Sequence, residues 1–197
     1  RAAVDLLVAK TEVEANVLAE KVNLKNEVRK QFDSDITEEA IAMIEANDAL
    51  RTSKSTVLFK NSWHKGVIGI VAARCVEKFY RPTVILTESN NKITGSARSV
   101  NGFDLYHAIL ECSDLLEKFG GHKYAAGLTL DISNLELFQR RFEEVVSSTI
   151  TEDMLTPVLE MDMPLHFDLI TTKFLTILKQ MAPFGPENQR PLFEASG

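Results

Sequence analysis

The stretch "TVILTESNNKITGSARS", residues 83–99, decides the fold of this 197-residue chain. Its first part, residues 83–88, is a continuous apolar run, which is typical of a strand buried on both faces. Residues 89–91 predict a turn, and residues 92–99 follow as the partner strand of a hairpin. We therefore expect this hairpin to lie at the centre of a layered domain.

Strands and helices alternate on both sides of the hairpin. Residues 55–60 predict a short strand, and residues 66–80 have the apolar spacing of a helix that Pro82 ends. The segments that follow the hairpin are a mostly helical stretch, a strand and a closing amphipathic helix, at residues 102–119, 125–132 and 134–149. This alternation predicts an α/β fold over residues 54–150: a small mixed β-sheet covered by helices.

Residues 1–53 predict a long helical connector. An apolar residue recurs at helical steps of three and four along its first part, at Val4, Val8, Ala15, Leu18 and Val22, with Thr11 in the same series. A second helix is expected to begin near Asp35, where Glu38 completes a capping pair. Arg1 falls inside the helical pattern, so we expect an upstream domain that is missing here.

Residues 151–197 differ again in character. Residues 157–170 alternate like a pair of strands, a short helical pattern follows, and three prolines fall within the last part of the chain. We interpret this section as the truncated start of a β-rich domain.

Composition limits the class of protein. The chain is 45% hydrophobic, but no apolar run approaches the roughly 20 residues that cross a bilayer. No secretory signal precedes the first helical segment. Cys75 and Cys112 both lie in apolar helical patterns, which favours buried free thiols in a reducing compartment. We expect a cytoplasmic protein without a membrane partner.

The charge is distributed unevenly along the chain. The net charge is −6, yet residues 54–123 hold ten Lys/Arg and six Asp/Glu, a net charge of +4. The remaining residues carry −10. A locally basic section attracts polyanions whatever the total charge. Ordinary solvated charge explains the same numbers equally well.

The segment "FGGHKY" contains the residues best suited to binding an anion. Gly120 and Gly121 allow close approach to backbone amides, and His122 and Lys123 add donors at the same place. This combination suits a phosphate. The alternative is that Gly120 ends the preceding helix and that His122 and Lys123 are merely solvated.

A second pair of donors strengthens the phosphate hypothesis. Ser96 and Arg98 alternate in their strand and therefore share one face. If this strand pairs antiparallel with residues 125–130, both side chains lie beside the Gly-Gly-His-Lys segment. An Arg fork, a hydroxyl and free amides at one place describe a site for a nucleotide backbone.

The segment "NSWHKGVIGIVA", residues 61–72, is a third candidate. A helix begins at Gly66, and a helix N-terminus favours anions. Trp63 and His64 precede it, and Trp63 offers a stacking face for a base. The alternative is that Trp63 packs in the core, as large aromatic residues usually do.

Several motifs together resemble one family. They are "SWHKGVIGIVAAR", "RPTVILTE", "GSARS", "FGGHKYAAGLTL" and "PFGPENQRPLF", in this order along the chain. This set resembles the bacterial RecJ single-stranded-DNA exonucleases, over the DHH-associated substrate-binding domain and its flanks. The Gly-Gly-His-Lys motif is shared with the wider DHH phosphoesterase superfamily.

The resemblance implies a manganese- or magnesium-dependent nuclease that degrades single-stranded DNA from the 5′ end. Its DHH domain holds the metals, the associated domain clamps the strand, and an OB-type domain gathers it. Ser96 and Arg98 would hold the 5′ phosphate, His122 and Lys123 would contact the backbone near the scissile bond, and Gly120 with Gly121 would permit close approach. Two departures are Glu187-Asn188-Gln189 in place of Gly-Asn-Pro, and Ala97 in place of a frequent Gly.

The chain lacks the residues for cleavage. It contains no Asp-His-His triplet, and its four histidines are scattered, whereas two-metal cleavage needs clustered ligands that hold ions about 3.5–4 Å apart. We therefore expect no catalytic residue and no bound metal or other cofactor here, with Mn or Mg in the missing DHH domain. Two alternatives stay open: an oligonucleotide or cyclic-dinucleotide phosphodiesterase of the superfamily, and a non-catalytic interaction scaffold.

Overall fold

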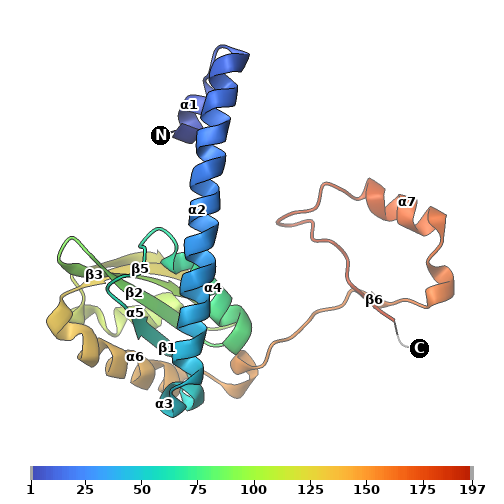
Figure 1. The fold of residues 1–197 in the computed structure, drawn as a ribbon. Coiled ribbons are helices and arrows are strands. Elements are labelled where there is room, and N and C mark those ends of the chain that lie inside the picture. The colour runs from blue at the N-terminus through green and yellow to red at the C-terminus, as the bar shows by residue number, and fades with distance from the viewer. Residues whose placement is uncertain (1, 196–197) are drawn as a thin grey trace. The chain divides into compact units, whose positions relative to one another are not determined.

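The computed structural model describes residues 2–195 as two units, one that extends to Thr156 and one that begins at Pro157. The first unit is an α/β domain with helices on both faces of a mixed sheet (Figure 1). This is the fold class that the alternating strands and helices predict. Within the described residues, no helix is both long enough and apolar enough to cross a membrane.

The sheet has five strands, which lie in the order β1-β2-β3-β5-β4. Their bounds are β1 Thr56–Phe59, β2 Thr83–Ser89, β3 Lys92–Arg98, β4 Lys118–His122 and β5 Ala125–Leu130. β1 pairs parallel with β2, and the other pairs are antiparallel. Asn90 and Asn91 turn the β2–β3 hairpin with φ angles of 55° and 58°, which suits a type I′ turn. The predicted hairpin and its pairing with β5 are confirmed.

Helices cover the two faces of the sheet differently. The helices of this unit are α1 Ala2–Leu7, α2 Glu12–Glu45, α3 Asp48–Thr52, α4 Ile68–Phe79, α5 Leu105–Leu110 and α6 Leu135–Thr149. α5 and α6 pack on one face, whereas α4 packs on the other face over β2 and β3. The C-terminal third of α2 packs on α4, and the rest of α2 extends past the sheet (Figure 1).

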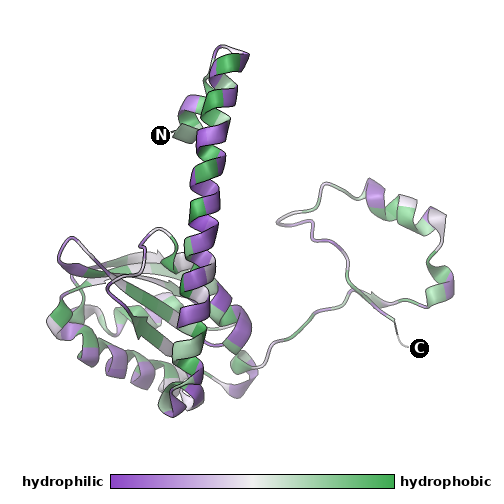
Figure 2. Ribbon diagram, in the orientation of Figure 1, coloured by the Kyte–Doolittle hydropathy of each residue, from purple (hydrophilic) through white to green (hydrophobic). Residues whose placement is uncertain are grey.

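Two hydrophobic cores result from this arrangement. Phe138 and Phe142 of α6 are fully buried in the first core, against the β2, β3 and β5 side chains of that face. The second core joins Ile85 of β2, Val71 of α4 and Ile44 of α2. Figure 2 shows the alternation of hydrophilic and hydrophobic residues along α6 that such one-sided burial requires.

Both cysteines are buried and free, as expected from their apolar patterns. Burial raises the pKa of the Cys75 thiol and of the Cys112 thiol to about 11 in each case. Both groups therefore stay protonated at neutral pH.

The helical section differs from the prediction in two places. The helix does not restart near Asp35, because α2 runs unbroken through it and Asp35 accepts a hydrogen bond from Gln31 within the helix. A break occurs earlier instead, where α1 ends at Leu7. Thr11 then caps α2, since its Oγ1 accepts a hydrogen bond from the Glu14 amide at 3.2 Å.

Residues 102–119 are less helical than predicted. α5 ends at Leu110, a 3₁₀ turn follows at Ser113–Leu115, and β4 begins at Lys118. Gly120 and Gly121 therefore lie inside a strand and do not end a helix. The reason is non-local: β4 is stabilised by its pairing with β5, which the apolar spacing of this segment does not reveal.

Among the described residues, the second unit contains two short strands, one α-helix and a 3₁₀ turn at Phe167–Leu169. The strands and the α-helix are β6 Met163–Pro164, α7 Thr172–Gln180 and β7 Phe193–Glu194. The expected strand pair within residues 157–170 is wrong, because β6 pairs parallel with β7 from the far end of the unit. Most large apolar side chains of this unit are exposed.

Candidate nucleic-acid interface

One face of the sheet stays open beyond α4, over β3, β5 and β4. Strand register places the side chains of this face in rows across the three strands. One row is Ser96, Gly127 and Gly120, and the next is Arg98, Ala125 and His122. Gly120, Gly127 and His122 are exposed. The antiparallel pairing therefore brings the Ser96–Arg98 pair and the Gly-Gly-His segment onto one surface, about 10 Å apart across two strand spacings.

The centre of this face carries no side chains, although the structure leaves room for them at Gly120 and Gly127. A Cβ added at Gly120 would meet nothing within 4 Å, and one at Gly127 would meet only the Gly95 carbonyl oxygen at 3.8 Å. Gly121 is different, because its φ is +152° and an added Cβ would lie 2.2 Å from the Ala125 carbonyl oxygen. Gly121 is thus required by the fold, whereas Gly120 and Gly127 leave the backbone open to a ligand.

A groove of about 540 Å³ lies between the N-terminus of α4 and β3. It is lined by Lys65, Gly66, Ile68, Gly69, Ile70, Thr94, Gly95, Ser96 and Arg98. Arg98 Nη1 donates to Ser96 Oγ at 3.2 Å and to the Ala97 carbonyl at 2.8 Å. We call this feature the phosphate groove, because an Arg fork, a hydroxyl and the first amides of a helix line it together.

Gly69 lets α4 approach this close to β3. A Cβ at Gly69 would lie 2.9 Å from Ser96 Oγ and 3.1 Å from Arg98 Nη2. The first turn of α4 therefore lies directly against the two predicted side chains. Its Ile70 amide donates to the Val67 carbonyl at 2.8 Å, so Ile68 and Gly69 supply the amides that could face a ligand. The groove joins a helix N-terminus to a cationic side chain at one place.

Trp63 and His64 have different environments. Trp63 is buried, with 4% of its surface exposed, and its Nε1 donates to Glu39 Oε2 at 2.7 Å. The proposed stacking face is therefore not accessible, and the alternative of core packing is the correct one. His64 is exposed and stacks on Phe32 of α2 with ring centroids 5.4 Å apart.

Lys123 lies in the two-residue loop between β4 and β5. It is exposed, and its Nζ lies 5.6 Å from the centroid of the Tyr124 ring. The Leu105 amide donates to the Lys123 carbonyl at 3.1 Å, which anchors the loop. The Lys123 side chain is thus available beside the His122 end of the open face.

The sequence prediction missed Gly69 and Gly127 of this interface. Both left a signal. A glycine inside a helix costs about 1 kcal/mol relative to alanine, and a glycine inside a strand often marks close backbone approach. Gly69 and Gly127 are such positions, and the structure shows a close neighbour at the first and an open face at the second.

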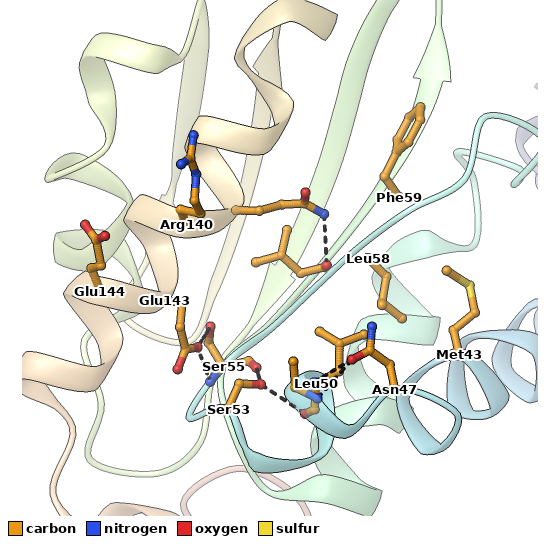
Figure 3. Close-up of a pocket in the computed structure, with 13 residues that line it drawn as sticks. Met43, Asn47, Leu50, Ser53, Ser55, Leu58, Phe59, Arg140, Glu143 and Glu144 are labelled. Atoms are coloured by element: carbon orange, nitrogen blue, oxygen red, sulfur yellow. Dashed lines mark hydrogen bonds between the residues drawn. The ribbon is translucent and has the colours of Figure 1, made fainter.

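A second hollow, of about 590 Å³, lies at the outer edge of β1 (Figure 3). None of the predicted site residues lines it. Its polar groups hold the fold together: Glu143 accepts hydrogen bonds from the amides of Lys54 and Ser55, and Gln139 donates to the Val57 carbonyl. The open face, and not this hollow, is therefore the candidate interface.

The described part of the chain offers no metal centre. Among residues 2–195, no three His, Cys, Asp or Glu side chains are grouped where they could hold a metal ion. The interface therefore has donors for phosphate oxygens but not the carboxylate and imidazole ligands that two-metal cleavage requires.

Comparison with known families matches two domains. Residues 52–148 match the DHHA1 domain, and residues 161–197 match the RecJ OB domain. The single-stranded-DNA-specific exonuclease RecJ of Bacillus subtilis is 37% identical over 191 residues, which are 96% of this chain and 24% of the relative. The Escherichia coli protein of the same name is 32% identical, over 92% of this chain and 33% of the relative.

A solved structure agrees with these matches. RecJ from Thermus thermophilus in complex with Mn²⁺ superposes with a TM-score of 0.87 at 26% identity. The match covers 98% of this chain and 28% of that one. The chain thus spans about a quarter to a third of the length of these relatives.

Proposed function

Because the chain belongs to the RecJ family and carries its DHHA1 domain, we propose that it is the strand-binding part of a single-stranded-DNA exonuclease. The observation that carries this proposal is the open face, where Ser96 and Arg98 lie in register with the bare backbone of Gly120 and Gly127. Relatives at 37% and 32% identity are named for single-stranded-DNA-specific exonuclease activity.

We propose that one DNA strand crosses β3, β5 and β4. Ser96, Arg98 and the first turn of α4 hold the phosphate at the 5′ end in the phosphate groove. Gly127 and Gly120 allow the sugar–phosphate backbone to approach the sheet, and His122 with Lys123 contacts the next phosphate.

We propose that cleavage requires residues that lie outside this part of the protein. The Thermus relative was solved with Mn²⁺, and the family therefore implies divalent ions. The described residues do not fit such ions, because they hold no cluster of ligands. We propose that the ions belong to a DHH domain of the longer protein and that residues 2–195 bind the strand without cutting it.

The second unit corresponds to a further domain of the family. We propose the boundaries 1–53, 54–150 and 151–197 for the connector, the strand-binding domain and the start of the OB-type domain. The RecJ OB match over residues 161–197 favours a strand-binding exonuclease over a dinucleotide phosphodiesterase, which would not need this domain.

The salt dependence of DNA binding tests the proposal. Each phosphate neutralised on a single strand contributes about −0.7 to the slope of log affinity against log salt. We expect Arg98→Ala and Lys123→Ala each to weaken binding of a 5′-phosphorylated oligonucleotide and to reduce the slope by about that amount. Fluorescence anisotropy at several salt concentrations measures both quantities.

Arg140→Ala is the matched control. Arg140 is an exposed cation of α6, on the opposite face of the sheet, so its removal changes the net charge equally. We expect its slope to equal that of the unmodified chain. If Arg98→Ala and Lys123→Ala leave the slope unchanged too, the strand does not use this face.

A further inference from the structure

We infer that Glu39 of α2 is a positioning residue for the phosphate groove, because it fixes the loop of residues 60–66 from which α4 begins. This inference rests on the proposed function of the groove. Glu39 lies on a different element from every residue that lines the groove, and its hydrogen bonds go to Lys60 and Trp63, which do not line it. Its effect on the strand would therefore pass through the loop.

Glu39 holds the loop at two points. Its Oε2 accepts a hydrogen bond from Trp63 Nε1 at 2.7 Å, and its Oε1 accepts one from Lys60 Nζ. These two donors lower the pKa of the Glu39 carboxyl below its ordinary value. The carboxylate is therefore ionised at neutral pH, which makes both hydrogen bonds charge-assisted.

Contacts with β2 and with α2 also hold the loop. Thr87 Oγ1 of β2 donates to the Trp63 carbonyl at 2.6 Å, and the ring of His64 stacks on Phe32 of α2. His64 Nδ1 accepts the Gly66 amide at 3.1 Å. The loop is thus held between α2 on one side and the sheet on the other.

The loop leads directly into the phosphate groove. Lys65 and Gly66 line the groove, and Gly69 follows one turn later against Ser96 and Arg98. The first turn of α4 sets the space for the ligand, since a Cβ added at Gly69 would lie 2.9 Å from Ser96 Oγ. A small shift of Trp63 would therefore move the amides of α4 relative to Arg98, and such sites lose affinity when their supporting contacts loosen.

α2 has a second ion pair that provides a matched control. Asp33 Oδ2 accepts a hydrogen bond from Arg74 Nη2 of α4 at 2.7 Å, and its side chain is 5% exposed. This pair also attaches α2 to α4, but neither of its residues belongs to the loop or lines the groove. Glu39→Ala and Asp33→Ala each remove one negative charge from α2 and release the donors that the carboxylate holds: Trp63 and Lys60 in the first case, Arg74 in the second.

Hydrogen–deuterium exchange of the folded chain measures how firmly the loop is held, without any ligand. We expect Glu39→Ala to speed exchange of the amides at residues 62–69, and Asp33→Ala to leave those amides as they are. Glu39→Gln should restore part of the protection, because its amide oxygen still accepts from Trp63 Nε1. Unchanged exchange in Glu39→Ala would overturn the inference.

Binding of a 5′-phosphorylated oligonucleotide gives the functional measurement. We expect Glu39→Ala to weaken binding about tenfold, Glu39→Gln less, and Asp33→Ala less than about twofold. Equal losses in the two alanine variants, or faster exchange in Glu39→Ala without weaker binding, would both contradict the positioning role. If the unmodified chain does not bind the oligonucleotide, the proposed function fails, and the exchange result still decides whether Glu39 fixes the loop.

Discussion

At the residue scale, the neighbouring positions 120 and 121 of β4 are both glycine, but the structure requires glycine only at Gly121. Gly121 has a φ of +152° and no room for a side chain beside Ala125 and Ala126. Gly120 faces open space on the side of the sheet that carries Ser96 and His122. The fold explains only the first; for the second, we propose that the bare backbone lets the DNA strand approach the sheet.

Two alanine substitutions separate these reasons. We expect Gly121→Ala to lower the free energy of unfolding by at least about 2 kcal/mol, because the backbone must shift to admit the methyl group. Gly120→Ala should change it by less than about 1 kcal/mol and still weaken oligonucleotide binding. Urea unfolding and fluorescence anisotropy measure the two effects. A Gly120→Ala variant that binds as tightly as the unmodified chain would show that the strand does not approach this backbone.

At the scale of elements, the ends of β3, β4 and β5 are joined by one cluster of charges. Lys92 Nζ of β3 donates to Asp131 Oδ2 at 3.0 Å, just after β5, and also pairs with Glu117, just before β4. Hydrogen bonds from the amide and hydroxyl of Ser133, and then the bond from Lys92, lower the pKa of Asp131 to about 2. This cluster holds together the three strands that carry the open face.

The pKa of Asp131 predicts a dependence of stability on pH. A carboxyl whose pKa is lowered by folding stabilises the protein above its unfolded pKa of about 4, and this stabilisation is lost as the pH falls through the folded value. We expect the free energy of unfolding to decrease more between pH 4.5 and pH 2.5 in the unmodified chain than in Asp131→Asn. Urea titrations at the two pH values test this. Equal decreases would mean that Asp131 titrates alike in both states.

At the scale of the whole molecule, the proposed function separates binding from cleavage. The first unit carries the open face, and the described residues of both units lack a group of metal ligands. We expect the chain to bind a labelled single strand in the presence of Mn²⁺ and to release no product. The full-length Bacillus subtilis relative serves as the positive control. Metal-dependent product from the purified chain, at a rate that follows its concentration, would contradict this division.

Much of the candidate site follows from the sequence because its signals are local. Ser96 and Arg98 share a face by alternation alone, and the hairpin of β2 and β3 follows from a buried run, an Asn-Asn turn and a second strand. The pairing of β3 with β5 was a hypothesis that the structure confirms. By contrast, the roles of Gly69 and Gly127 depend on which segment lies opposite each of them.

The sequence by itself determined the α/β class, the central hairpin and the chemistry of the donors, because these depend on periodicity and on residue type. Only the tertiary structure decided that residues 118–122 form a strand, that Trp63 is buried against Glu39 and that α2 is continuous through Asp35. The physical reason is that an edge strand and a buried indole are stabilised by partners far away in the chain. Such contacts leave little trace in the spacing of neighbouring residues.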